Sequence, residues 1–222
     1  MYPPRPDQSG NILFLILLAV VLFAALAYAV TQSMRGGGKT ATPEKISAAI
    51  AQVNQHATAI ENFVMRAMMM NNVPEYGFEF VGENTTSTAS NNTCTSDNCR
   101  ILKSVDSLAL PVELRDPATV VSKESLRAAI VLNIGTSAPD LMLLYRYLNK
   151  EACEAINKLY LGSPTMPNEG WGTAIGYGGT LTSFPAATGV IGDDSPLLVG
   201  QKTACFYHSS DGYSFYHVIL ER

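Results

Sequence analysis

Charged residues are scarce in this chain. Charged residues make up 15% of its 222 residues, the formal net charge is −4, and Lys and Arg form no block. A nucleic-acid-binding surface needs such a basic block, so the sequence excludes nucleic acid as a partner. The motif "HSSD" puts His, Ser and Asp in one turn, where they do not converge as a catalytic triad does. We therefore predict a protein that is not an enzyme and uses no cofactor or metal.

Cysteine is limited to four residues, namely Cys94, Cys99, Cys153 and Cys205. An even number of cysteines beside an export-type N-terminus indicates two disulfides formed in an oxidising compartment. Four cysteines allow three pairings, and we favour a local Cys94–Cys99 loop with a long-range Cys153–Cys205 link. A zinc site is the alternative, but Cys153 and Cys205 lack the short spacing of paired zinc ligands.

Residues 11–30 lack charge, proline and glycine altogether. As a helix they would be about 30 Å long, which is the thickness of the hydrocarbon core of a bilayer. Three interpretations remain open. A secretory signal would be removed after "AYA" at residues 27–29, a static anchor would stay uncut, and a prepilin-type segment would be cut between Gly10 and Asn11. The expected disulfides place the following part of the chain outside the cytoplasm.

Glycine is concentrated directly after this apolar span, where it interrupts any continuous helix. We predict a hinge over residues 36–42, and it contains Gly36, Gly37 and Gly38. Thr42 and Pro43 then form a helix start, a hydroxyl N-cap followed by proline.

Apolar residues recur at helical spacing through residues 43–71, which predicts an amphipathic helix with one face packed on a sheet. We interpret His56 on this helix as a solvated or capping residue. The stretch "MRAMMM" near the end of the helix is interpreted as packing, because Met fills irregular gaps.

Beyond the helix the sequence predicts mainly strands. Residues 75–84 alternate as a strand does, and residues 140–148 are an apolar strand. Residues 122–133 are expected to begin as a helix at Ser122 and to continue as the strand "AAIVLN". A short helix follows, capped by Asn149 and stopped by Gly162.

The C-terminal segment "TACFYHSSDGYSFYHVILER" predicts a β-hairpin with Asp211-Gly212 as a two-residue turn. This register places His208 opposite Phe215 and Phe206 opposite His217, all on one face. The two histidines would then be near enough to share a metal, but no third ligand is nearby, so we predict aromatic packing.

Residues 163–200 are rich in glycine and proline and predict an extended excursion with small strands. Asp193 and Asp194 in "GDDSP" could offer two carboxylates to Ca²⁺, but a simple turn is the interpretation we prefer. Trp171 and Tyr177 lie in this excursion. They would hold a sugar or peptide if the chain were a static membrane-anchored binding module, which is the alternative function.

The leader "MYPPRPDQSG" is short, hydrophilic and ends in glycine, and the apolar run "NILFLILLAVVLFAALAYAV" follows it at once. This order resembles type IV pilins and pseudopilins. The run and the ending "FYHVILER" are also similar to an uncharacterised group of bacterial prepilin-like membrane proteins. These families usually have Glu where Leu15 stands, and a continuous helix where "RGGG" interrupts this one. The fold predicted is α+β, with a long N-terminal hydrophobic helix, an amphipathic helix packed on an antiparallel β-sheet, and a C-terminal β-hairpin.

The resemblance implies a structural subunit of a type IV pilus-like or pseudopilus-like filament, anchored in the bacterial cytoplasmic membrane before assembly. The implied partners are membrane lipid, a prepilin peptidase, and copies of the N-terminal helix or other pilin-like subunits. The exported domain would be periplasmic or extracellular, and part of a surface filament once assembled. The division of the chain is a leader over residues 1–10, a transmembrane and filament-core helix over 11–35, the hinge over 36–42, and the exported domain over 43–222.

Overall fold

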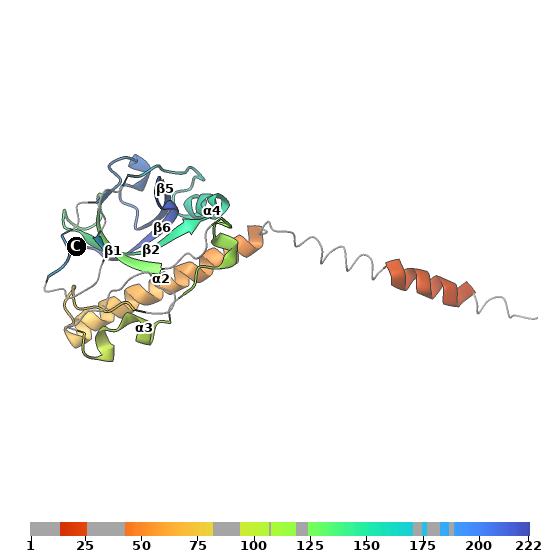
Figure 1. The fold of residues 1–222 in the computed structure, drawn as a ribbon, viewed down its shortest axis with the longest axis horizontal. Coiled ribbons are helices and arrows are strands. Elements are labelled where there is room, and N and C mark those ends of the chain that lie inside the picture. The colour runs from red at the N-terminus through yellow and green to blue at the C-terminus, as the bar shows by residue number, and fades with distance from the viewer. Residues whose placement is uncertain are drawn as a thin grey trace, which may run out of the picture. The chain divides into compact units, whose positions relative to one another are not determined.

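The computed structural model describes residues 14–25, 43–81, 94–106, 108–118, 124–170, 175–176, 183–186 and 189–222. The chain divides into two units, Met1–Thr42 and Pro43–Arg222. In the first unit, residues 14–25 form a helix, drawn in red in Figure 1. The predictions at Gly10, at Asn11 and in the hinge of residues 36–42 lie outside the described residues. Within the described part of the chain, no helix is both long enough and apolar enough to cross a membrane.

The second unit begins with the long helix α2 (Pro43–Asn71), as the spacing of apolar residues predicts. Asn72 takes a positive φ of 51° and Pro74 follows it, so the helical backbone ends here. The buried residues of α2 recur every three or four positions and form one stripe: Ala49, Ile50, Val53, Ala57, Ile60, Phe63, Val64 and Ala67.

Beside α2 lies a sheet with the strand order β3-β1-β2-β6-β5, and β4 pairs with β1 off this path. The strands are β1 (Glu124–Val131), β2 (Asp140–Leu148), β3 (Ile175–Gly176), β4 (Val190–Ile191), β5 (Thr203–His208) and β6 (Gly212–Leu220). Neighbours along the path are antiparallel, as predicted. The pair β4 and β1 is parallel, so the sheet is mixed. The expectation of a purely antiparallel sheet is wrong here, because the excursion returns beside β1 in the same direction.

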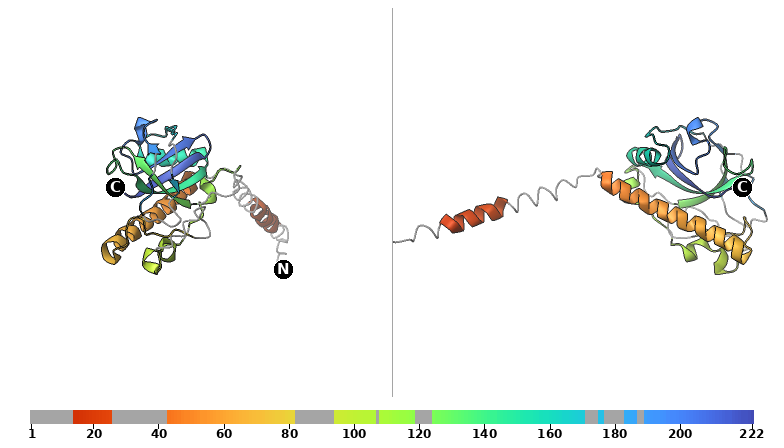
Figure 2. Two further views of the ribbon diagram at one scale, coloured as in Figure 1. Left: turned by 60° about the vertical axis from the view of Figure 1, so that its left-hand side comes forward. Right: turned by 180° about the vertical axis from the view of Figure 1, so that it is seen from behind.

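Two hydrophobic clusters lie on the two faces of this sheet, because side chains alternate along each strand. We call the face that packs against α2 and α4 (Lys150–Tyr160) the helical face, and it includes Leu143 of β2 and Cys205 of β5. The other face, which includes Leu144 and Phe206, is covered by β4 and by the 3-10 turn η3 (Pro196–Leu198), and we call it the loop face. Figure 1 shows α2 along one side of the sheet and the blue segment near residue 196 on the other, and Figure 2 shows the same layers from two further sides.

The hairpin of β5 and β6 is present, but its register differs from the predicted one. His208 pairs with Gly212, so three residues rather than two connect the strands. Gly212 has a φ of +64°, in the left-handed region that glycine tolerates at the end of such a loop. The partner of His208 is thus three positions away from the predicted partner, Phe215. Because three is an odd number, Phe206 and Phe215 lie on opposite faces of the sheet. It separates the histidines too, because His208 shares the strand face of Phe206 whereas His217 faces α2.

Helix α4 and the disulfides agree with the sequence. The Asn149 side chain accepts a hydrogen bond from the Ala152 N–H at 2.7 Å, and Gly162 beyond the helix has a φ of +70°. The structure confirms the two disulfides, Cys94–Cys99 and Cys153–Cys205, with Cα–Cα distances of 5.6 and 5.4 Å. The second bond joins α4 to β5 within the core of the helical face.

Two local predictions are wrong. The strand expected over residues 75–84 reduces, within the described residues, to an isolated parallel bridge between Glu79 and Arg100. Arg100 lies between η1 (Asp97–Cys99) and α3 (Ile101–Ser104), so a bridge of one residue pair takes the place of a longer strand. Glu124 and the residues after it are strand rather than helix, because pairing with β2 outweighs their local helix propensity. The remaining short element is η2 (Val112–Leu114).

Candidate functional site

His56 and Glu124 form a buried polar pair between α2 and β1. Their side chains are 8% and 0% exposed, and His56 Nε2 lies 2.7 Å from Glu124 Oε2. The Tyr145 hydroxyl donates to the same carboxylate oxygen at 2.8 Å, and the Leu108 N–H donates to the other oxygen at 3.2 Å. The interpretation of His56 as a solvated or capping residue is therefore wrong, because its partner lies 68 positions away on another element.

The network around Glu124 is saturated, which marks it as structural. Burial, together with the nearby Glu124 carboxylate, raises the pKa of Tyr145 well above its ordinary value, so the phenol keeps its proton and donates. Both carboxylate oxygens of Glu124 already accept hydrogen bonds. A buried carboxylate with satisfied acceptors fixes how α2 sits on β1 and β2, and it offers nothing to a ligand.

A second polar group ties α2 to the hairpin. Thr203 Oγ1 and His217 Nδ1 are 2.7 Å apart, and His217 Nε2 lies 3.2 Å from Glu61 Oε2. Lys202 Nζ pairs with Glu61 at 3.3 Å and with Glu221 at 2.8 Å. Burial lowers the pKa of His217, while the Glu61 carboxylate opposes that shift.

The order hydroxyl, imidazole, carboxylate in this group is that of a catalytic triad, but its setting differs. Thr203 is only 7% exposed, so a substrate has no access to its hydroxyl. A nucleophile has to lie within reach of the reacting atom, with donors beside it for the developing negative charge. We therefore interpret the group as a link between α2 and the edge of the sheet.

Three carboxylates gather at the loop face, from Glu169, Asp193 and Asp194. One ligand oxygen of each lies within 4.8 Å of the others. Glu169 is 1% exposed, whereas both aspartates are exposed. Burial first, and the contact with Asp193 second, raise the pKa of Glu169 to about 7. The sequence marks the two aspartates as possible Ca²⁺ ligands but gives no signal for Glu169, because Glu169 precedes them by more than twenty residues.

Backbone amides hold this acidic group in place. Glu169 Oε2 accepts from the Gly192 N–H at 3.0 Å, and Asp194 Oδ2 accepts from the Gly170 N–H at 2.8 Å. The backbone N–H of Glu169 donates to the carbonyl of Tyr207 on β5 at 3.0 Å. The group thus lies where the segment after α4 meets the turn that follows β4.

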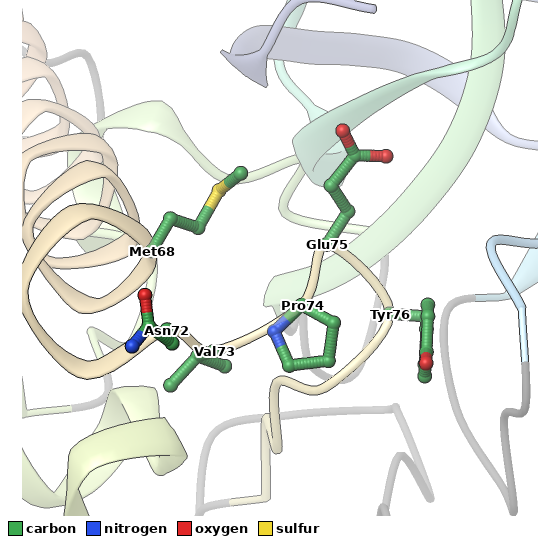
Figure 3. A pocket seen from close by; sticks show the side chains of 6 residues that line it. All are labelled: Met68, Asn72, Val73, Pro74, Glu75 and Tyr76. Carbon is green, nitrogen blue, oxygen red and sulfur yellow. The ribbon is translucent and has the colours of Figure 1, made fainter.

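The C-terminal half of α2 exposes methionines. Met65, Met69 and Met70 are 42%, 71% and 73% exposed, so the interpretation of "MRAMMM" as packing is wrong for these three. Met68 does pack against the core of the helical face. A shallow hollow of about 380 Å³ lies at the end of the helix, where Figure 3 shows Pro74 between Met68 and Tyr76. Its wall is mainly apolar and it has no convergent set of polar groups, so it lacks the character of a specific ligand site.

The other predicted site residues are placed as follows. Leu15, in the position where the resembling families have Glu, belongs to the helix of residues 14–25 and is 56% exposed. Trp171 and Tyr177, which the alternative function would use, lie outside the described residues. Comparison with family models, with curated proteins and with solved structures found no match.

Proposed function

We propose that this chain is a non-enzymatic structural subunit of a type IV pilus-like or pseudopilus-like filament, displayed on its apolar N-terminal helix. The helix of residues 14–25 carries the proposal, because all its large apolar side chains are exposed. Their exposed fractions range from 48% at Leu18 to 77% at Phe23. An apolar surface of this extent requires cover by lipid or by another protein.

Two different surroundings would cover the apolar surface of this helix, one before assembly and one after it. Before assembly, lipid of the bacterial cytoplasmic membrane surrounds residues 11–35. During assembly, the same surface packs against copies of the helix or against other pilin-like subunits. A prepilin peptidase would cut the leader after Gly10, and the hinge of residues 36–42 would let the domain reorient. Leu15, in place of an acidic residue, suits a minor or tip-like subunit rather than a major one.

The disulfides support an exported, periplasmic or extracellular location for the domain. Disulfides persist in oxidising compartments, and thiols in the cytoplasm are kept reduced. The Cys153–Cys205 bond lies fully inside the core, with both sulfur-bearing residues 0% exposed. The two cysteines are separated by 52 positions in the sequence, and the segment between them includes the entire loop-face cover. The bond therefore limits how far this cover can open.

The experiment is mass spectrometry of the mature N-terminus after expression in a bacterium that has a prepilin peptidase. We expect the mature chain to begin at Asn11, and sheared surface material to contain filaments by electron microscopy. A chain that begins at Val30 is a secreted domain, and one that keeps Met1 is a static anchor. Either of these results contradicts the proposal.

A pair of leader variants sharpens this experiment. Gly10→Val removes the residue at the expected cut, so the chain should keep Met1, stay in the membrane fraction and form no filaments. Ser9→Ala is the matched control, because it changes the neighbouring residue and should be processed and assembled normally. Equal processing of both variants would exclude cleavage after Gly10.

A further inference from the structure

We propose that Glu169, Asp193 and Asp194 form a binding site for a divalent cation, and that Ca²⁺ is the ion that occupies it. The site lies at the loop face, between the segment that follows α4 and the turn that follows β4. The proposal stands on the geometry of the exported domain, so it does not depend on whether the chain forms filaments.

The spacing of the three carboxylates fits one ion. A ligand oxygen from each residue lies within 4.8 Å of the other two. Oxygen ligands lie about 2.4 Å from Ca²⁺, so two ligands on opposite sides of the ion are about 4.8 Å apart. All three carboxylates can therefore bind the same ion without rearrangement of the backbone.

The buried carboxyl group of Glu169 is an independent indication that a ligand binds at this site. The residue is 1% exposed, and its Oε1 has no hydrogen-bond partner among the described residues. Its other oxygen, Oε2, accepts from the Gly192 N–H, which holds the carboxyl group beside the turn that carries Asp193. A buried carboxylate oxygen without a donor is costly, and a cation would satisfy it.

No described residue of opposite charge forms an ion pair with these groups. Within the described part of the chain, none of the ion pairs includes Glu169, Asp193 or Asp194. Three carboxylates held this close repel one another, so the arrangement attracts a small cation.

The donor set points to Ca²⁺ among the divalent ions. All three side chains offer oxygen, and zinc or copper sites normally include His or Cys. Mg²⁺ demands near-ideal octahedral geometry, whereas Ca²⁺ accepts irregular sets of six to eight oxygens with water completing them. Two of the three carboxylates are exposed and lie in a turn, which suits the more tolerant ion.

The backbone is built closely around the site. Asp194 Oδ2 accepts from the Gly170 N–H at 2.8 Å, and a Cβ at Gly170 would lie 2.6 Å from that same oxygen. A side chain at this position would displace Asp194. Glu169 is also held by its N–H bond to Tyr207 of β5, so an ion here would fasten the β4 turn to the edge of the sheet.

The test uses the full chain, purified in detergent, treated with EDTA and then titrated with CaCl₂. We expect binding by calorimetry with a Kd on the order of 10⁻⁴–10⁻³ M, as for extracellular calcium modules. At 10 mM CaCl₂ the thermal midpoint should rise by about 4–8 °C, and equal MgCl₂ should give a clearly smaller shift. Wild-type protein that neither binds Ca²⁺ nor shifts would overturn the proposal.

Variants assign the binding to this site. Asp193→Asn with Asp194→Asn should weaken binding at least tenfold, and so should Glu169→Gln, which keeps an acceptor for the Gly192 N–H. The matched control is Asp97→Asn with Asp106→Asn, which removes two exposed carboxylates elsewhere and should leave binding unchanged. Equal loss in the control would show charge screening instead of a site. If lowering the pH raises the midpoint but Ca²⁺ has no effect, Glu169 and Asp193 share a proton and the cation site is excluded.

Discussion

The helical face and the loop face of the sheet are covered in different ways. On the helical face, α2 and α4 bury long runs of apolar residues, and the buried Glu124 carboxylate is paired with His56 of α2. On the loop face, a short strand and a 3-10 turn cover a smaller core, and one oxygen of Glu169 has no hydrogen-bond partner among the residues that the structure describes. Helices and strands satisfy the hydrogen-bonding groups of their own backbone. A loop that covers a sheet has to be held by side-chain hydrogen bonds, turns or bound ions instead.

The largest expected effect separates the two disulfides. In the chain-entropy model, Cys153→Ala with Cys205→Ala should lower the free energy of unfolding by about 4 kcal/mol, because this bond closes a long loop. The Cys94–Cys99 bond closes a loop of only a few residues. Cys94→Ala with Cys99→Ala should therefore lower the free energy of unfolding by only about 2 kcal/mol. Urea unfolding of the full chain in detergent, followed by tyrosine fluorescence, measures both values. An equal loss in the two variants would show that the long bond does not hold the loop-face cover.

The second prediction breaks the saturated network of the helical face. Glu124→Ala removes the carboxylate that His56 and Tyr145 share. His56 loses its bond to β1, and the Tyr145 hydroxyl keeps only its longer hydrogen bond to the Leu108 carbonyl at 3.3 Å. The free energy of unfolding should fall by about 3–4 kcal/mol, because a broken buried pair costs more than an absent one. Glu124→Gln keeps an acceptor and is the matched control, with an expected loss about half as large. A loss below about 1 kcal/mol in the alanine variant would contradict the structural role of the network.

The third prediction compares equal truncations on the two faces. Leu143 on the helical face and Leu198 on the loop face are both fully buried leucines. Leu143→Ala should cost about 4 kcal/mol, because central strand β2 is paired on both sides and cannot move to fill the cavity. Leu198→Ala should cost about 2–3 kcal/mol, because the η3 turn can relax toward the gap. Chemical unfolding of both variants provides the comparison, and a larger loss at Leu198 would reverse it.

The same contrast explains how much the sequence alone could predict. The α2 boundaries and stripe follow from helical periodicity, and Asn149 and Gly162 mark α4 through local hydrogen bonds and backbone conformation. Both disulfides were also predicted correctly. These signals are local or leave few alternatives, so they can be read without knowing the tertiary structure.

Several of the wrong predictions depend on contacts between distant parts of the chain. The local sequence around His56 does not show its partner Glu124, which lies on another element. Residues 124–127 have local helix propensity, and only their pairing with β2 makes them a strand. The hairpin register failed for a different reason, since the choice between a two- and a three-residue loop decides which face each residue occupies. In the acidic group, Asp193 and Asp194 were visible, but only the fold brings Glu169 to them.

The smallest expected effect concerns pH and the link between α2 and the hairpin. Burial lowers the pKa of His217 below the value of about 6.5 that a histidine has in the unfolded chain. Below pH 6.5 the unfolded state therefore binds more protons than the folded state, so this residue makes stability fall as the pH drops. Between pH 7 and pH 5 the contribution of His217 to the free energy of unfolding should therefore fall, by less than the losses expected above.

The measurement is the difference in the free energy of unfolding between wild type and His217→Gln over this pH range. Taking the difference is necessary because burial raises the pKa of Asp140 and of Glu169, which makes stability increase as the pH drops. The variant should lack the His217 contribution, so its stability should fall less on acidification than that of wild type. If His217→Gln follows wild type, the imidazole stays uncharged or solvated, and the contact with Glu61 does not hold α2 to the hairpin.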